Sequence, residues 1–212
     1  MNKNVNQKLK TLAISALGMF VTGMVLANNN PANAANDFPP FEKVAENYRK
    51  VVSTADGRPS MYTIYRDSAK NQLLAELPSD YSRKKIFIAT SIAGGSSFTG
   101  WQWMDMYCYW KQVNKQLVLM EPELQYQSRG GEQISRSVKR TYSDRVILSV
   151  PIVTMGPGGG PVIDLDSLLV GQAGRFGMPL NSSLTTIENV KAFPSNIELT
   201  FEGPGSDGRL LK

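Results

Sequence analysis

The pattern of apolar and polar residues changes character twice along this 212-residue chain. Residues 1–10 are polar, and residues 11–27 form an uncharged and mostly apolar run. Residues 41–52 then place apolar side chains three and four positions apart, which predicts an amphipathic helix with its charged side outward. From residue 61 onward, short apolar runs rich in β-branched and aromatic residues predict strands.

The region from 61 to 212 therefore reads as a series of strands separated by turns rich in glycine, proline and asparagine. The predicted strands are 61–66, 72–77, 85–93, 105–113, 116–126, 145–155, 161–165, 185–192 and 196–202. Many short strands with such turns favour a mainly β (β-rich α+β) fold. We expect antiparallel sheets in a sandwich-like or open-barrel-like arrangement, with one N-terminal amphipathic helix.

Three details of this region carry further expectations. Residues 85–93 are apolar at both alternating sets of positions, which predicts a central strand buried on both faces. Pro122 cannot donate a backbone hydrogen bond and should fall at a strand end or a sheet edge. Asp166 is expected to cap a short helical turn that runs through Leu169.

The first 34 residues match the pattern of a secretory signal peptide. Lysines precede the apolar run, and Ala32-Asn33-Ala34 follows it. We predict cleavage after Ala34 and export to the periplasm or the cell exterior. An uncleaved membrane anchor is the alternative, but the apolar run is shorter than the ~20 residues that a spanning helix needs. After cleavage, residues 35–60 would form a linker and the amphipathic helix, and no stable membrane anchor would remain.

Most of the formal net charge of +5 belongs to this leader. Removing residues 1–34 removes Lys3, Lys8 and Lys10 and no acidic residue, which leaves +2 on residues 35–212. Nucleic-acid binding needs a strongly basic patch. We therefore expect no nucleic-acid partner.

The sequence contains no histidine and a single cysteine. Without histidine, the chain can form neither a histidine zinc site nor a Ser-His-Asp or Cys-His pair. One cysteine cannot form an internal disulfide, and Cys108 is expected to be a buried, inert thiol. We expect no enzymatic activity, no catalytic residue and no metal or other cofactor site in this chain.

Residues 101–110 are the most aromatic part of the chain. Strand alternation places Trp101, Trp103, Tyr107 and Tyr109 on one face. An exposed aromatic face could stack on sugar rings, whereas a core packed on both sides explains the same pattern without a ligand. Trp101 and Trp103 are thus candidate interface residues of a stand-alone extracytoplasmic module that binds glycan or a cell-surface polymer.

Two further segments hold candidate interface residues. The sequence MGPGGGP at 155–161 lacks the lysine and the Ser/Thr of a phosphate loop. Its glycines either allow a sharp loop or let a partner's backbone approach, so Gly158 and Gly159 are candidate contacts. Arg140 and Arg145 belong to a basic cluster that either docks an acidic surface or is a solvated turn.

Asp164 and Asp166 are two positions apart and would share a strand face. Together with loop carbonyls they could offer oxygen ligands to Ca²⁺. Calcium sites need six or more oxygens, however, and the sequence names only these two side chains.

An ordered series of short segments is more specific than any one of these motifs. The segments are FPPFEKV at 38–44, LAELP at 74–78, FIATSIAGG at 87–95, YWK at 109–111, SVKRTYSDRV at 137–146 and MGPGGGPVIDLDSLL at 155–169. From about residue 38 to residue 212, the series resembles the N-terminal domain of unknown function in bacterial secreted zinc-dependent metallopeptidases.

In proteins of that family, a catalytic domain with His-Glu-x-x-His follows, in which the histidines hold zinc and the glutamate activates water. This sequence contains no such segment, so no zinc ligand or general base is carried over. The resemblance implies an exported non-catalytic domain, or a truncated form, that packs against or restrains a zinc peptidase domain. That domain would be in cis or encoded by a neighbouring gene, and zinc would belong to it alone.

Overall fold

The computed structural model describes residues 38–178 and 180–212. The chain divides into two units, residues 1–34 and 35–212, and the fold described below belongs to the second. The predicted signal peptide, its cleavage site at Ala34 and residues 35–37 of the linker lie outside the described residues. Over the two described ranges, no helix is both long and apolar enough to span a membrane.

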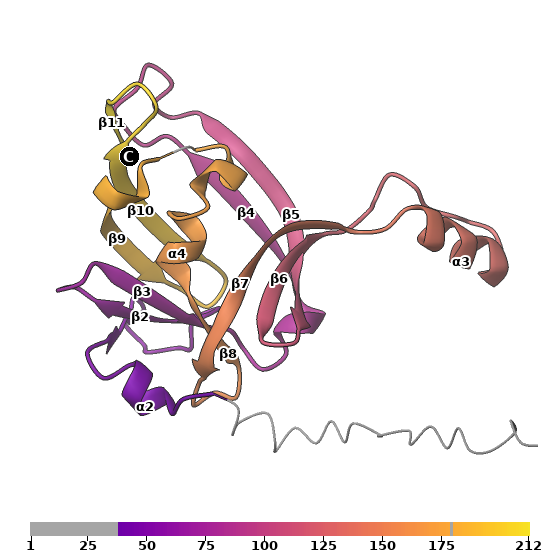
Figure 1. Cartoon of the computed structure of the whole chain (residues 1–212), viewed down its shortest axis with the longest axis horizontal. Helices are drawn as coiled ribbons and strands as arrows, with labels where there is room; N and C mark the ends of the chain where they lie inside the picture. The colour runs from indigo at the N-terminus through magenta and orange to yellow at the C-terminus, as the bar shows by residue number, and fades with distance from the viewer. Residues whose placement is uncertain (1–37, 179) are drawn as a thin grey trace, which may run out of the picture. The chain divides into compact units, whose positions relative to one another are not determined.

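The fold is built on one curled antiparallel sheet of eight strands (Figure 1). The order across the sheet is β1-β2-β3-β8-β7-β6-β5-β4. These strands are β1 Arg49–Lys50, β2 Thr63–Asp67, β3 Gln72–Glu76, β4 Lys85–Ser91, β5 Gln102–Val113, β6 Gln116–Glu121, β7 Arg145–Met155 and β8 Pro161–Asp164. The predicted mainly β, antiparallel fold class is confirmed, and the curled sheet corresponds to the open-barrel-like form.

A second sheet of three strands bridges the two ends of the curled sheet. Its strands are β9 Thr186–Ala192, β10 Ile197–Pro204 and β11 Leu210–Leu211. Near β2, the Met61 N–H donates to the Phe193 carbonyl at 2.7 Å. Beyond β4, the Ala93 N–H donates to the Lys212 carbonyl at 2.6 Å. The small sheet therefore closes the gap that the curled sheet leaves open.

The helices of the described chain are short. They are α2 Phe41–Val44, α3 Glu132–Thr141 and α4 Leu165–Leu169, with the 3₁₀ helices η2 Tyr81–Arg83, η3 Ala173–Phe176 and η4 Ser182–Leu184. The predicted helix over 41–52 is wrong beyond Val44, because Lys50 pairs with Tyr65 of β2 and the Val51 N–H donates to the Ile64 carbonyl at 2.8 Å. These sheet hydrogen bonds outweigh the weak helix propensity of a short segment.

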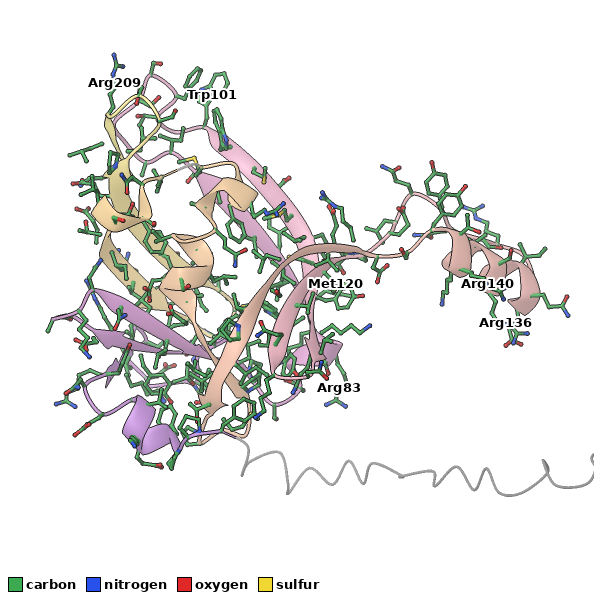
Figure 2. The ribbon with its side chains drawn as sticks, viewed as in Figure 1. Arg83, Trp101, Met120, Arg136, Arg140 and Arg209 are labelled. Carbon is green, nitrogen blue, oxygen red and sulfur yellow. The ribbon has the colours of Figure 1, made fainter. Side chains whose placement is uncertain are left out.

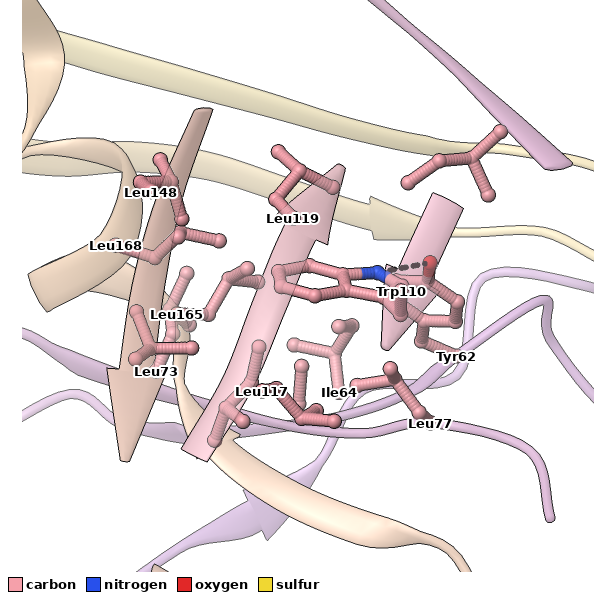
Figure 3. Packing of buried hydrophobic residues seen from close by; sticks show 14 of the residues in the cluster. Tyr62, Ile64, Leu73, Leu77, Trp110, Leu117, Leu119, Leu148, Leu165 and Leu168 are labelled. Atoms are coloured by element: carbon pink, nitrogen blue, oxygen red, sulfur yellow. Dashed lines mark hydrogen bonds between the residues drawn. The ribbon is translucent and has the colours of Figure 1, made fainter. Parts of the chain in front are cut away.

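The main core lies between the concave side of the curled sheet and a cover made by β9, α4 and η3. The fully buried residues of this cluster include Ile64, Leu73, Leu77, Cys108, Leu117, Leu119 and Ile163. The cover contributes Leu168, Phe176 and Ile187. Inside the core, the Trp110 indole N–H donates to the Tyr62 hydroxyl at 3.1 Å (Figure 3), so burial leaves the indole N–H paired.

The outer face of the curled sheet is covered on one half only. On β2, β3 and β8, a second cluster of Tyr65, Leu74 and Val162 is covered by Phe41 and Val44 of α2. On β4 and β5, Phe87 and Tyr107 of this face are 62% and 44% exposed, whereas Val118 and Met120 of β6 are only 9% exposed. The outer face of β4 and β5 is therefore an exposed apolar surface of the described domain.

Two local expectations fail on this sheet, and one holds. The prediction that 85–93 is a central strand buried on both faces is wrong: β4 is an edge strand, with Ile86 buried and Phe87 exposed. Asp164, not Asp166, caps α4, because its carboxylate accepts from the Ser167 N–H at 2.8 Å. Pro122 does follow a strand end, since β6 ends at Glu121, as predicted.

The core predicts a clear contrast between buried and exposed leucines. Leu119→Ala should lower the free energy of unfolding by about 2–5 kcal/mol, because it removes a fully buried side chain and leaves a cavity. Leu184→Ala, at a position 63% exposed, should change it by less than about 0.5 kcal/mol. Urea denaturation followed by tryptophan fluorescence measures both, and equal losses would contradict this description of the core.

Candidate functional site

An exposed group of three aromatic side chains lies where β4 turns into β5. We call Phe98, Trp101 and Trp103 the aromatic cluster. Trp101 is 61% exposed and Trp103 46% exposed. The Phe98 ring lies 5.4 Å from the Trp101 ring and 6.0 Å from the Trp103 ring, centroid to centroid, so it contacts both. The cluster is thus a preformed surface rather than three isolated side chains.

Strand alternation and a hydrogen-bonded loop position the cluster. In β5, Trp103 and Tyr107 are exposed, whereas Met106, Cys108 and Trp110 are buried. The predicted sorting of this segment into two faces is confirmed, and its aromatic face is exposed rather than packed in a core. Burial raises the pKa of the Cys108 thiol to about 11, as fits the inert thiol expected from the sequence.

Residue 212 lies at the same end of the domain as the aromatic cluster. The Lys212 N–H donates to the Gly94 carbonyl at 3.2 Å, and its ammonium group pairs with Glu188 at 2.8 Å and Glu202 at 2.9 Å. Gly95 has φ +83°, and a Cβ there would lie 1.8 Å from the Leu210 carbonyl oxygen. Glycine at this position therefore lets the last strand approach the loop that carries the cluster.

A hollow joins these features. It measures about 220 Å³, and Phe98, Trp103, Arg209 and Leu211 are among the residues that line it. Figure 2 shows Trp101 and Arg209 at this same end of the structure. The aromatic cluster, the hollow and the final strand together form one candidate contact surface.

A second candidate surface is the excursion between β6 and β7, which the sequence analysis did not identify as helical. We call residues 122–144 the arm. It contains α3 and is joined to the sheet by two segments without regular secondary structure (Figure 1). No residue of α3 is buried, and Ile134 is 58% exposed. The rings of Tyr126 and Tyr142 stack within the arm at 3.9 Å.

Charged and polar contacts hold the base of the arm. The Arg145 Nε–H donates to the Glu121 carboxylate at 2.6 Å. The Asp144 carboxylate accepts from the Tyr109 hydroxyl and, at 3.0 Å, from the Glu123 N–H. The Tyr109 hydrogen bond lowers the pKa of Asp144, and the same contact raises the pKa of Tyr109 to about 12. The arm therefore leaves the sheet from a defined junction.

Between the arm and the outer face of the sheet lies a groove of about 750 Å³. β5 and β6 contribute Tyr109, Lys111 and Met120 to its lining, and Figure 2 shows Met120 near the junction of sheet and arm. From the arm come Glu123, Tyr126, Gln127, Ser128, Ser135, Val138, Lys139, Tyr142, Ser143 and Asp144. A basic cluster was predicted here from the sequence but the groove was not, because the groove depends on where the arm lies relative to β5.

The candidate interface residues from the sequence do not form one site. Trp101 and Trp103 belong to the aromatic cluster, whereas Arg140 lies on α3 and Arg145 at the base of the arm. Figure 2 places the labelled Trp101 and Arg140 in separate parts of the domain. Arg145 pairs with Glu121, whereas Arg140 has no ion-pair partner within the part of the chain that the structure describes.

Gly158 and Gly159 lie in the loop between β7 and β8, which wraps around a buried carboxylate. Glu76 is 5% exposed and accepts from the Gly158 N–H at 2.6 Å and from the Tyr65 hydroxyl at 3.0 Å. A Cβ at Gly160 would lie 1.7 Å from the Leu77 carbonyl oxygen. The glycine-rich motif thus has a role within the fold, which is to let the loop pack closely against the end of β3.

Asp164 and Asp166 are close enough to influence one another. The Leu73 N–H donates to Asp166 at 2.6 Å. Burial, and then the neighbouring Asp164 carboxylate, raise the pKa of Asp166 to about 6. Across the described ranges, no group of three or more acidic, cysteine or histidine side chains is arranged to hold a metal ion.

Comparison with known proteins does not assign a function. No protein-family model, no curated protein and no solved structure matches this chain.

The close approach of the glycine-rich loop predicts a position-specific loss of stability. Gly160→Ala should lower the free energy of unfolding by about 2–4 kcal/mol, since the new methyl group overlaps the Leu77 carbonyl and forces the loop to move. Gly174→Ala is the matched control, because nothing lies within 4 Å of a Cβ there. Urea denaturation of both variants checks this, and an unchanged midpoint for Gly160→Ala would contradict it.

The Asp164–Asp166 pair predicts a pH dependence of stability. The folded-state pKa of Asp166, about 6, lies above the ordinary value of 3.8, so the folded protein holds more protons than the unfolded chain between these values. Stability should therefore fall as the pH rises through this window. Asp166→Asn removes the effect and can keep the bond to Leu73, so its stability relative to the parent should improve by about 1 kcal/mol between pH ~4 and ~7, allowing for solvent screening. Urea denaturation measures both proteins. If the stability difference between Asp166→Asn and the parent did not change with pH over that range, the raised pKa of Asp166 would be refuted.

Proposed function

We propose that this chain is an exported, non-catalytic domain that packs against a zinc peptidase domain through its aromatic cluster. The observation that carries the proposal is the exposure of Trp101 and Trp103 beside residue 212. The resemblance of the ordered sequence segments supplies the identity of the partner. The chemistry would belong to the partner, since this sequence has no histidine with which to bind zinc.

The aromatic cluster has the properties of a docking anchor. Tryptophan and tyrosine dominate the energetics of protein interfaces because they bury a large area with few rotatable bonds. Here Phe98 contacts both tryptophan rings, so part of the ordering cost is met before a partner binds. The adjacent hollow offers room for a side chain from the partner.

The position of Lys212 suits a partner in cis. Its backbone is hydrogen-bonded to Gly94, a few residues from Phe98. A polypeptide continuing from this residue would emerge beside the aromatic cluster, and a linked domain would meet the cluster at high effective concentration. The same surface could also bind a peptidase encoded by a neighbouring gene, but without the high effective concentration of a linked domain.

Export is part of the same proposal. Cleavage after Ala34 would release residues 35–212 into the periplasm or the medium, the compartment in which a secreted peptidase would fold and act. There, the domain would restrain or support the catalytic domain.

The proposal is tested first in the DNA that follows the codon for Lys212. It requires an in-frame, frameshifted or neighbouring region that encodes His-Glu-x-x-His. That peptidase domain, produced with residues 35–212, should form a complex detectable by size-exclusion chromatography and calorimetry. Trp101→Ala with Trp103→Ala should weaken the complex by about tenfold or more, as loss of an interface anchor does.

Val52→Ala with Leu184→Ala is the matched control, because both residues are exposed and apolar but lie outside the cluster. It should leave the affinity unchanged. The absence of a peptidase region in the DNA, or equal binding by the tryptophan variant, would refute the proposal.

A second candidate function is a stand-alone module that binds glycan or a cell-surface polymer. It is favoured by one observation, the solvent exposure of two neighbouring tryptophans on a preformed surface. Sugar rings stack on such side chains through their apolar faces. Retention of residues 35–212 on polysaccharide columns, lost in the tryptophan variant but kept in the Val52/Leu184 control, would select this function over peptidase docking.

A further inference from the structure

The arm carries an inference that does not depend on the aromatic cluster. α3 is a 10-residue helix with no buried residue. Isolated helices of this length are marginal in water, because helical stability in proteins comes mostly from tertiary packing. Ile134 adds an apolar side chain that is 58% exposed. These properties are typical of an element that completes its packing against a partner.

The lining of the groove shows which side of α3 faces a ligand. Ser135, Val138, Lys139 and Tyr142 line it, at the spacing of one helical face. The opposite wall is the outer face of the sheet at Tyr109, Lys111 and Met120. The groove therefore combines apolar surface with two ammonium groups, one from each wall, and with the two carboxylates of Glu123 and Asp144.

The acidic groups of the groove already have donors within the protein. Asp144 accepts from the Tyr109 hydroxyl and the Glu123 N–H, and the Glu123 carboxylate accepts from the Gln125 and Tyr126 N–H groups.

The basic groups differ. The side chains of Lys111 and Lys139 make no hydrogen bond or ion pair in the described ranges, although Lys85 and Lys111 lie close enough to Asp144 to help lower its pKa. Lys85 lies 3.5 Å from the centre of the Tyr109 ring and adds a third positive charge nearby. Counted with Lys85, the groove thus holds three positive charges against the two carboxylates of Glu123 and Asp144, which leaves a net charge of +1 for an acidic ligand to match.

We propose that this groove binds an extended acidic segment of a partner polypeptide. Carboxylates of the segment pair with Lys111 and Lys139, and its apolar side chains lie against Met120, Val138 and the tyrosine rings. A peptide fits better than a dense polyanion, because Asp144 and Glu123 would repel closely spaced charges while leaving room for separate carboxylates. Occupation of the groove would cover Val138 and Tyr142 and so stabilise α3.

The experiment uses residues 35–212 and a fluorescein-labelled peptide of alternating glutamate and leucine, followed by fluorescence anisotropy. Binding should weaken between about 50 mM and about 500 mM salt, because exposed charge pairs are screened. The same peptide with glutamine in place of glutamate should bind at least about tenfold more weakly. Equal binding of the two peptides would overturn the proposal.

Variants separate the groove from general surface charge. Lys111→Gln with Lys139→Gln should weaken binding of the acidic peptide by about tenfold or more. Lys43→Gln with Lys70→Gln removes the same charge away from the groove and should bind like the parent. All four lysines are exposed, so the variants should fold, which circular dichroism verifies. If both double variants lost the same amount of peptide affinity, net charge alone would explain the binding and the proposed groove site would be refuted.

Two further readouts complete the test. Amide hydrogen exchange of residues 132–141 should slow when the acidic peptide binds, which general charge attraction would not produce. Trp101→Ala with Trp103→Ala should leave peptide binding unchanged, so failure of the groove and failure of the aromatic cluster are distinguishable. Binding of a hyaluronate oligosaccharide, with none of the peptide, would replace the proposal by a glycan site.

Discussion

The fold depends on closing a curled sheet that has two free edges. The small sheet bridges them through the Met61–Phe193 hydrogen bond at one end and the Ala93–Lys212 hydrogen bond at the other. Closure places Ile187 and Phe176 over the concave core and leaves Trp110 buried with its indole N–H paired to Tyr62. A curled sheet without this bridge would expose its core to water.

The outer face of the same sheet explains where the two candidate surfaces lie. α2 covers β2, β3 and β8, whereas Phe87 of β4 and Tyr107 of β5 remain exposed on the outer face. The aromatic cluster lies at one end of this uncovered region, and the arm borders it at β5 and β6. One domain therefore has an exposed aromatic surface beside residue 212 and a separate groove lined by both lysines and carboxylates.

Sequence patterns predicted the strands well where alternation or turn chemistry was strong. β7 has the predicted bounds, and the two faces of β5 were sorted correctly, because one apolar and one exposed face leave a period of two in the sequence. The edge position of β4 could not be predicted, because the sequence alone does not distinguish an exposed phenylalanine such as Phe87 from a buried one. The helix at 41–52 was overestimated because hydrogen bonds to β2 compete with local propensity.

The candidate sites were likewise predicted only where a local sequence pattern marks them. Trp101 and Trp103 were recognised from local pattern, but their proximity to Lys212 depends on pairing between residues far apart in sequence. α3 was missed because its apolar positions are few, at Ile134 and Val138. The sequence did contain the helical spacing of Ser135, Val138, Lys139 and Tyr142. That spacing indicates one side of a groove only when the opposite wall, formed by β5, is known.

The register of β6 and β7 has a consequence for how such a domain can diversify. Glu121 and Arg145 are direct neighbours across the two strands, so the 23 residues of the arm occupy a place where a tight hairpin turn would suffice. Insertions at such a point should change the stability of the rest of the domain little, because the strands on either side are already paired. The arm is in this sense a replaceable module, whose length and charge can change while the closed sheet beneath it stays the same.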